Sequence, residues 1–310
     1  MDLKAKKIVH GRSSKSDIND ARVLGVDWIG IFYGTSPSSR KYKFNVNKTQ
    51  CLSQIENAIK YAKDQGLKLR FTAEDASRTE ESFLIEVATL AQKSGADRFS
   101  FADTVGCLTP SKSKRIISKI AYEIDIPVHV HFHNDFGMGT ANSLSALEGG
   151  AQCVDLTING LGERCGIAPL AEVITALVSI YNKKENYWNL ELIPVLTDLV
   201  NKICNFNSRF NQPIIGKNAF THKAGIHSKG ILKNPLTYEA FSPQIVKRDR
   251  KILINKFSGV SALKSKLKNI NLELTKEELG LAIAKIKSFK TKNDWSKEEL
   301  YLLVENIKES

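Results

Sequence analysis

The stretch Val128-His-Val-His-Phe-His-Asn-Asp135 has the alternating pattern of a β-strand that ends in polar residues. Successive side chains of a strand point to opposite faces, so His129, His131 and His133 share one face. Imidazoles two residues apart on one face can bind a single divalent cation. Histidines that are merely exposed or hydrogen-bonded are the simpler interpretation, but three of them at the carboxyl end of one strand favour a metal site. In a (β/α)8-type barrel, active sites lie at that end.

Regular alternation surrounds this strand. Between residues 6 and 160, short runs rich in β-branched residues alternate with segments of helical periodicity, which is typical of repeated βα units around a parallel sheet. Helix starts are marked by Thr109-Pro110 and by the capping-box pair Asn47 and Gln50. The pattern therefore predicts an α/β fold. Six runs have the character of strands: 6–12, 28–35, 67–73, 98–104, 127–133 and 153–160.

Length and composition are those of an ordinary globular protein. The chain has 310 residues, 42% hydrophobic and 25% charged, and about 150 residues per domain gives roughly two structural units. The longest apolar stretches, such as Trp28 to Tyr33, fall far short of the ~18 residues of a membrane span, and the first residues lack the apolar core of a secretory signal. Five cysteines occur without a Cys-x-x-Cys pair, which argues against a zinc ribbon and a disulfide framework. We therefore expect a cytoplasmic protein with no membrane association.

The net charge of +12 allows a nucleic-acid interpretation, because clustered Lys and Arg bind phosphates. Much of the excess, however, is lysine in helix-like segments between residues 263 and 287, next to leucines and isoleucines. This pattern favours a solvated helix face, or a surface suited to anionic substrates. We expect no nucleic-acid partner.

Polar residues also end two neighbouring strands. Arg70, Thr72 and Glu74 alternate along one strand and share a face, and Asp103-Thr104 ends the next strand. These groups can hold a carboxylate or a water molecule, although a structural salt bridge between Arg70 and Glu74 is an alternative. The segment Gly160 to Gly166 is glycine-rich, but it lacks the lysine of a Walker loop and is weak evidence for a phosphate site.

The pattern changes after about residue 180. We expect a helix over 192–205 and a loop-rich stretch over 206–242 that holds His222 and His227, with Tyr238 eleven residues beyond His227. Imidazole titrates near neutrality and is a natural proton shuttle, although a helix N-terminus with incidental histidines explains this segment equally well. Two capping boxes predict a small helical unit at the end: Thr275 with Glu278, and Ser296 with Glu299.

Several of these motifs together resemble one family. His-Phe-His-Asn-Asp at 131–135, Gly-Met-Gly-Thr-Ala-Asn-Ser-Leu at 137–144 and Asn-Gly-Leu-Gly-Glu-Arg at 159–164 look like the acyl-CoA-dependent Claisen condensing enzymes, namely homocitrate, 2-isopropylmalate and citramalate synthases. The similarity runs from about residue 6 to residue 267. Arg-Phe-x-x-Glu-Asp at 70–75 and Phe-Thr-His-Lys-Ala-Gly-Ile-His at 220–227 look most like homocitrate synthase.

The resemblance implies a TIM barrel with a C-terminal lid, a divalent metal (Mn, Mg or Zn), and condensation of acetyl-CoA with 2-oxoglutarate to homocitrate. By matching position, His131 and His133 are the expected metal ligands, and the metal polarises the ketone of the oxo acid. His227 and Tyr238 match a lid pair that assists proton transfer at the acetyl methyl group, usually in the neighbouring subunit's barrel. Glu74 is the expected catalytic carboxylate. The expected oxo-acid residues are Arg12, Arg70, Thr72, Thr104, His129 and Asn134.

Two features depart from the family pattern. Homocitrate-type relatives often carry a carboxylate at the position of His129, which bears on acid-base chemistry and substrate choice. The family's first strand, with Arg-Asp/Glu-Gly-Glu-Gln and an acidic third metal ligand, has no counterpart here, and residues 6–12 match the third strand. At about 31 residues per unit, some 60 residues are absent, which leaves residues 6–12 and 153–160 as open edges of a six-stranded sheet.

These expectations define an organisation and a leading hypothesis. The organisation is a TIM barrel lacking its first two βα units over 1–182, a linker helix and lid over 183–242, and a helical subdomain over 243–310. We expect a separate polypeptide to supply the first two units, within a homo- or hetero-oligomer. The alternatives are a non-catalytic subunit, an incomplete reading frame, and a 2-isopropylmalate or citramalate synthase. The sequence leaves open which metal binds and whether the product serves lysine synthesis or a nitrogenase cofactor.

Overall fold

A computed structural model describes residues 4–183, 185 and 188–309. The chain divides into two compact units, residues 1–174 and residues 175–310. Each unit has its own hydrophobic core.

The first unit is built on a six-stranded parallel sheet whose strands follow one another in chain order. This arrangement confirms the α/β fold and the βα repeat predicted from the sequence. The strands are β1 (Ile8–Arg12), β2 (Trp28–Gly34), β3 (Leu69–Glu74), β4 (Arg98–Asp103), β5 (Val128–Phe132) and β6 (Cys153–Val154).

The last strand is much shorter than expected. Only Cys153–Val154 pair with β5, and Ile158–Gly160 form a 3-10 turn instead of continuing the strand. Asn159 and Gly160 have φ values of 61° and 70°, a left-handed backbone that cannot continue a strand. The prediction of a strand over 153–160 was therefore wrong after its first residues.

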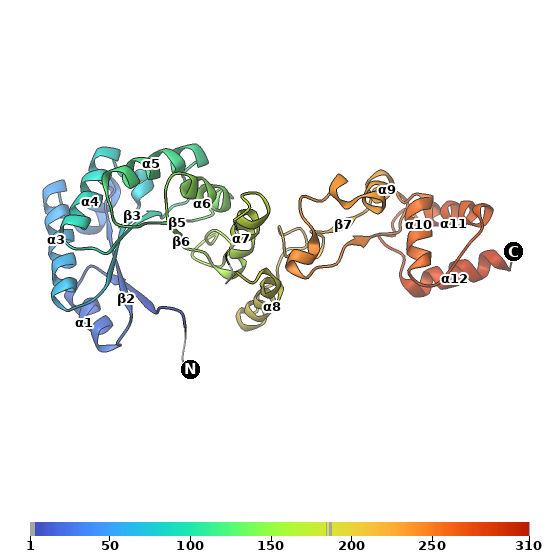
Figure 1. The fold of residues 1–310 in the computed structure, drawn as a ribbon, viewed down its shortest axis with the longest axis horizontal. Coiled ribbons are helices and arrows are strands. Elements are labelled where there is room, and N and C mark those ends of the chain that lie inside the picture. Colours follow the sequence, from blue (N-terminus) through green and yellow to red (C-terminus); the bar gives the residue numbers. More distant parts are fainter. Residues whose placement is uncertain (1–3, 184, 186–187, 310) are drawn as a thin grey trace. The chain divides into compact units, whose positions relative to one another are not determined.

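Helices pack on the outer face of the sheet, as Figure 1 shows for α3, α4 and α5. Apolar side chains on the outer face of the strands and the inner faces of these helices form one core, in which Phe71 and Phe99 lie 6.3 Å apart between ring centroids. The capping box predicted at Asn47 and Gln50 is present. The helices are α1 (Lys15–Val23), α2 (Pro37–Ser39), α3 (Lys48–Asp64), α4 (Glu81–Lys93), α5 (Pro110–Glu123) and α6 (Gly139–Glu148). A short π-helix lies at Arg40–Phe44 and a 3-10 turn at Ala76–Arg78, and α7 (Leu170–Ser179) follows the sheet.

The sheet is open, with β1 at one edge and β6 at the other. Among the described residues only β2 pairs with β1, and the residues of β1 alternate between exposed and half-buried along its two faces. Unpaired backbone groups on an edge strand are a template for pairing with a further strand.

The second unit contains α8 (Ile193–Cys204) and a two-stranded parallel pair, β7 (Thr221–His222) and β8 (Lys251–Ile252). The stretch 206–242 is less irregular than expected, because α9 (Gly225–Lys233) begins within the motif that carries His227. Short turns lie at Leu190–Leu192, Pro235–Thr237 and Pro243–Val246.

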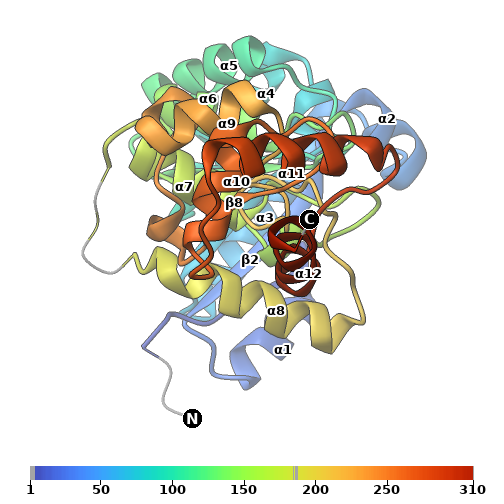
Figure 2. The ribbon, with the colours of Figure 1, turned by 90° about the vertical axis from the view of Figure 1, so that its right-hand side faces the viewer.

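Three helices close the second unit and pack together around Leu263, Ile286 and Leu300 (Figure 2). Both predicted capping boxes, at Thr275 and at Ser296, are present. The helices are α10 (Val260–Lys268), α11 (Lys276–Ser288) and α12 (Lys297–Lys308). Among the described residues, no helix has the length and apolar character needed to cross a membrane.

The packing of α3 on the sheet predicts unequal cysteine reactivity. Cys51 is 0% exposed, and burial raises the pKa of its thiol to about 11, whereas Cys107, Cys165 and Cys204 are exposed. Because the thiolate is the reactive form, we expect Cys51 in the folded protein to react with a thiol reagent at pH 8 at least about a hundredfold more slowly than these three. Peptide mass spectrometry of the labelled protein, with and without urea, measures the rates. Equal labelling in the native protein would contradict this packing.

Candidate active site

A cavity of about 490 Å³ opens on the inner face of the sheet, at the carboxyl ends of the strands. Parallel pairing brings alternate residues of neighbouring strands into register on this face, as with Thr72 and Ser100 or Ala102 and His131. The structure therefore gathers six of the residues singled out in the sequence: Arg70, Thr72, Glu74, Thr104, His131 and His133. Five further residues complete the lining: His10, Phe32, Ala102, Asp155 and Glu163.

Asp155 is the centre of the charge network in this cavity, and sequence reasoning missed it. Its carboxylate accepts hydrogen bonds from Arg70 Nη1 at 3.0 and 3.2 Å and lies 3.2 Å from His131 Nδ1. Burial alone would raise the pKa of Asp155, but the hydrogen bond to His131 and the charge of Arg70 lower this pKa to about 2. Asp155 lies two residues after Cys153, which pairs with β5, so the two side chains share a face of the sheet. That spacing is the feature of the sequence from which Asp155 could have been predicted.

This network replaces the salt bridge between Arg70 and Glu74 that the sequence allowed. Arg70 pairs with Asp155 instead, and Glu74 accepts a 2.5 Å bond from Lys43. Only part of the Arg70 guanidinium is used. In the described part of the chain, its Nε atom is buried and has no hydrogen-bond partner.

His131 and His133 present their Nε2 atoms to each other at 3.4 Å. That separation suits two imidazole nitrogens that bind the same ion, each at about 2.1 Å. Because Asp155 holds Nδ1 of His131, the Nε2 atom of this ring faces its neighbour. Burial, followed by the charge of His131, lowers the pKa of His133, which favours the neutral ring that a metal requires. These two side chains therefore fit a divalent metal, but the described residues contain no group of three or more His, Cys, Asp or Glu suited to one.

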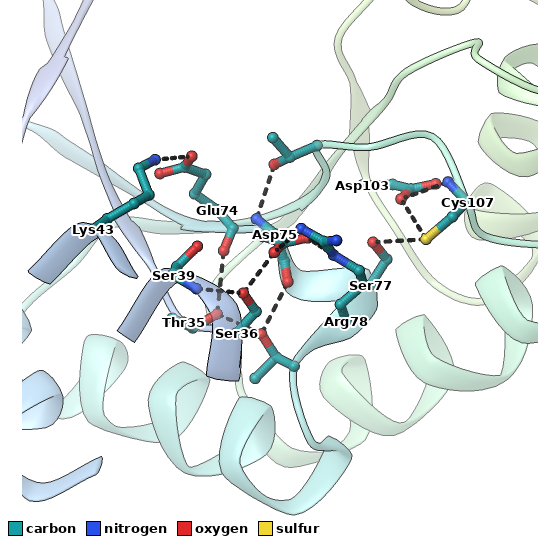
Figure 3. Close-up of polar contacts among 12 residues, drawn as sticks. Thr35, Ser36, Ser39, Lys43, Glu74, Asp75, Ser77, Arg78, Asp103 and Cys107 are labelled. Atoms are coloured by element: carbon teal, nitrogen blue, oxygen red, sulfur yellow. Dashed lines mark hydrogen bonds and ion pairs between the residues drawn. The ribbon is translucent and has the colours of Figure 1, made fainter. Parts of the chain in front are cut away.

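The end of β3 is braced by a polar cluster on the outer side of Glu74 (Figure 3). Asp75 is buried, accepts a 2.5 Å bond from Ser36 and pairs with Arg78 at 2.7 Å. The backbone N–H of Asp75 donates to Thr104 Oγ1 at 2.8 Å. Because Thr104 Oγ1 accepts this bond, its own hydrogen is available to a group in the cavity.

The glycine-rich segment after β6 is a structural loop at the rim of the cavity. A Cβ at Gly166 would lie 1.7 Å from the carbonyl oxygen of Gly160, so only glycine fits this crossing. Arg164 donates to Asp135 at 2.8 Å and to the Thr104 carbonyl at 2.7 Å, which fixes the loop against the ends of two strands.

Three residues expected at the oxo-acid site lie outside the cavity lining. Arg12 is exposed on the edge strand and pairs with Asp17 at 2.8 Å. His129 is buried one layer deeper, where Arg98 Nη1 lies 3.2 Å from its Nε2. Burial, together with the Arg70 charge, lowers the pKa of His129 to about 4. Asn134 accepts a bond from the backbone N–H of Gly139, at the start of α6.

His10 lines the cavity where Arg12 was expected to contribute. It stacks on Phe32, with ring centroids 5.1 Å apart, and desolvation with the nearby Arg70 charge lowers its pKa to about 4. Gly30 leaves room for this ring, since a Cβ there would lie 2.7 Å from His10 Cδ2 and 3.5 Å from Arg70 Nε and Nη2. The pattern His10-Gly-Arg12 showed from the sequence that two basic residues share one face of this strand. Only the tertiary structure shows that His10, and not Arg12, lines the cavity.

His227 and Tyr238 lie together in the second unit. Their ring centroids are 4.1 Å apart with an angle of 34° between the planes. The rings belong to α9 and to the residue after the turn Pro235–Thr237.

Comparison with protein families gives two matches along the chain. The profile of the HMGL-like family matches residues 2–200, and that of the homocitrate synthase post-HMGL domain-like family matches residues 214–294.

Curated relatives carry two names. The chain is 44% identical over 280 residues to a homocitrate synthase of Sulfurisphaera tokodaii, with 90% of this chain and 60% of the relative covered. It is 40% identical over 299 residues to a homocitrate synthase of Saccharolobus islandicus, covering 96% and 64%. It is 43% identical over 277 residues to a 2-isopropylmalate synthase of Methanocaldococcus jannaschii, covering 89% and 53%. The chain thus spans between about half and two thirds of the length of these relatives.

Solved structures agree on the fold. A hydroxymethylglutaryl-CoA lyase from Pseudomonas aeruginosa has a TM-score of 0.57 at 19% identity and covers 71% of this chain and 74% of its own. The HMG-CoA lyase from Brucella melitensis has a TM-score of 0.56 at 17% identity, covering 64% and 74%. The family profile over residues 2–200, the parallel βα architecture and these neighbours together establish that the chain belongs to the HMGL-like family of TIM-barrel proteins.

Proposed function

We propose that this chain carries most of the active site of an acyltransferase that joins acetyl-CoA and 2-oxoglutarate in a Claisen condensation, after which water hydrolyses the thioester to give homocitrate and CoA. The observation that carries this proposal is the unused edge of the Arg70 guanidinium. Its Nε and Nη2 atoms lie over Gly30, beside His10, and Nε is buried without a partner in the described residues. A second carboxylate on the oxo acid satisfies that edge through a bidentate pair. The homocitrate synthases among the relatives support the same substrate.

The other cavity residues complete a site for a 2-oxo dicarboxylic acid. Thr72 Oγ1 and one oxygen of Glu74 are buried and have no partner in the part of the chain that is described, so a ligand supplies theirs. Thr104 offers a hydroxyl hydrogen because Asp75 already occupies its oxygen. Arg70, Thr72 and Thr104 bind the oxo acid, and Glu74 moves a proton at the reacting centre.

His131 and His133 would hold a divalent metal, Mn, Mg or Zn, which when bound acts as a Lewis acid on the ketone. Asp155 contributes by accepting the Nδ1 hydrogen of His131, which leaves Nε2 free to ligate. Its charge also balances Arg70, so the cavity does not present an uncompensated cation before the substrate arrives.

His227 and Tyr238 are proposed to assist proton transfer at the acetyl methyl group. An imidazole and a phenol in contact offer a base and a hydrogen-bond donor, which enolate formation from a thioester requires. Their action on the cavity of a neighbouring subunit is part of this proposal, as is an oligomeric enzyme in the cytoplasm.

The open edge of β1 supports the proposal that further barrel strands pair with this sheet. We propose that they come from a second polypeptide, which brings the acidic metal ligand that the resemblance implies. Within the described part of the chain, His131 and His133 alone leave the metal site short of the three protein ligands typical of catalytic centres.

A 2-isopropylmalate or citramalate synthase is the second candidate, favoured by the Methanocaldococcus jannaschii relative. These reactions use oxo acids without a second carboxylate. Such a substrate leaves the Arg70 edge unpaired, which costs binding energy in a buried site. A non-catalytic subunit that retains oxo-acid binding is the third.

Substrate choice is tested by calorimetry with Mn²⁺ and a series of oxo acids. We expect 2-oxoglutarate to bind at least about tenfold more tightly than 2-oxoisovalerate or pyruvate, because the diacid alone pairs with Arg70. Arg70→Lys removes the fork and should abolish this preference, whereas Arg115→Lys, at an exposed pair with Glu81, should keep it. Tighter binding of 2-oxoisovalerate would favour the second candidate.

Gly30→Ala tests the place of His10 in the cavity. The new Cβ would lie 2.7 Å from His10 Cδ2, so the ring must swing away along the edge strand and expose the Arg70 edge. We expect 2-oxoglutarate affinity to fall about tenfold with the far-ultraviolet circular dichroism unchanged. Gly280→Ala is the matched control, since nothing lies within 4 Å of its Cβ position. Full affinity in Gly30→Ala would remove His10 from the site.

Release of free CoA from acetyl-CoA and 2-oxoglutarate tests the need for a partner. We expect the isolated chain to be inactive and to gain activity when a polypeptide bearing the Arg-Asp/Glu-Gly-Glu-Gln strand is added, because that strand supplies the third metal ligand. His131→Ala should remove the restored activity. Turnover by the isolated chain would refute the second polypeptide, and a mixture that binds 2-oxoglutarate without turnover would indicate a regulatory subunit.

A further inference from the structure

A buried charged cluster lies directly beside the ring pair of the second unit. The side chain of Glu239 is only 4% exposed, and its two carboxylate oxygens each accept a 2.6 Å bond from Arg250, one from Nε and one from Nη2. His222 Nε2 lies 3.2 Å from the same carboxylate, with its side chain 11% exposed. The hydrogen bonds from Arg250, against the effect of burial, lower the pKa of Glu239.

The cluster ties three separate segments together. His222 is the last residue of β7, and Arg250 immediately precedes β8, its parallel partner. Glu239 follows Tyr238 in the chain, and its backbone N–H donates to the carbonyl of Pro235. Through Glu239, the backbone that carries Tyr238 is therefore attached to both strands.

Stability alone does not account for this cluster. Removing a carboxylate and a guanidinium from water costs about as much as their attraction returns, and apolar residues of similar size often stabilise a protein equally well. A bidentate pair does, however, define one orientation of its two residues. Such a pair therefore suits a role in which the position of a neighbour matters.

Tyr238 needs such support because its own burial is small. The residue is 45% exposed, yet its ring lies with its centroid 4.1 Å from that of the His227 ring. It lies against Gly230, where a Cβ would approach Tyr238 Cε2 to 2.7 Å. Gly230 thus lets the ring approach α9 closely, while packing leaves nearly half of Tyr238 exposed.

We propose that Glu239 is a positioning residue, and that its clamp by Arg250 and His222 holds the Tyr238 ring against His227. The functional consequence rests on the proposed role of this ring pair in proton transfer. The contact between the two rings is independent of that role and can be measured without turnover.

Carbon-proton correlation spectra of the histidine rings report directly on the contact between His227 and Tyr238. The spectra are simple to assign because the chain has only six histidines. In the full chain, the ring current of Tyr238 should shift the His227 ring protons upfield, with the signal assigned by His227→Gln. Glu239→Gln and Arg250→Lys each break the bidentate pair and should abolish most of that shift while the signals of His131 and His133 stay in place. Glu191→Gln is the matched control, because Glu191 forms an exposed pair with Lys247 in the same unit.

The second measurement is the activity of the chain mixed with the polypeptide that bears the Arg-Asp/Glu-Gly-Glu-Gln strand. We expect Glu239→Gln to lower kcat about tenfold or more and to leave KM for 2-oxoglutarate unchanged, because the oxo-acid site does not include this residue. An upfield His227 signal that persists in both Glu239→Gln and Arg250→Lys would overturn the clamp. If the wild-type mixture shows no turnover but the shift disappears in these variants, the clamp stands and the proposed function fails.

Discussion

The register of the six parallel strands is the constraint on which the first unit depends. Pairing in register sends every second residue of neighbouring strands to one side, so apolar residues such as Phe71 and Phe99 meet on the outer face. The same rule brings Arg70, Glu74 and His131 to the inner face, at the carboxyl ends of the strands. A slip of one residue in any strand would bury its polar set under the helices and open the core to water. The same strand register therefore produces both the hydrophobic core and the polar cavity.

Electrostatic balance then determines what the inner face can bind. Four of the lining residues are basic or imidazole groups, and Asp155 bridges two of them, Arg70 and His131. Desolvation and the Arg70 charge keep His10 and His129 neutral near pH 7, since both pKa values lie at about 4. The Arg70 guanidinium in the cavity is therefore matched by Asp155, Glu74 is paired with Lys43, and Glu163 adds a third carboxylate to the lining. Among the described residues, the Nε atom of Arg70 has no partner. The charge of the cavity is thus determined by these local groups and does not follow the overall net charge of +12.

The second unit is stabilised by two different kinds of contact. Its three C-terminal helices are joined by ordinary apolar packing and capping boxes, whereas the region around α9 depends on buried polar contacts. Apolar packing tolerates substitution, but a bidentate charged pair defines one geometry. The region around α9 thus combines short elements with a buried bidentate pair, an arrangement that fits the role proposed for His227 and Tyr238.

The sequence by itself determined the kind of fold, because strand and helix periods and caps are local properties. It also pointed to the residues at strand ends, since period-two alternation shows which of them share a face, as for Arg70, Thr72 and Glu74. It could not show which strands face one another closely enough for Asp155 to reach both Arg70 and His131, or that His10 and not Arg12 lines the cavity. It also missed the end of β6, because the left-handed backbone at Asn159 overrides the strand propensity of the residues around it. Those features depend on contacts between residues far apart in the chain, and only the tertiary structure decides them.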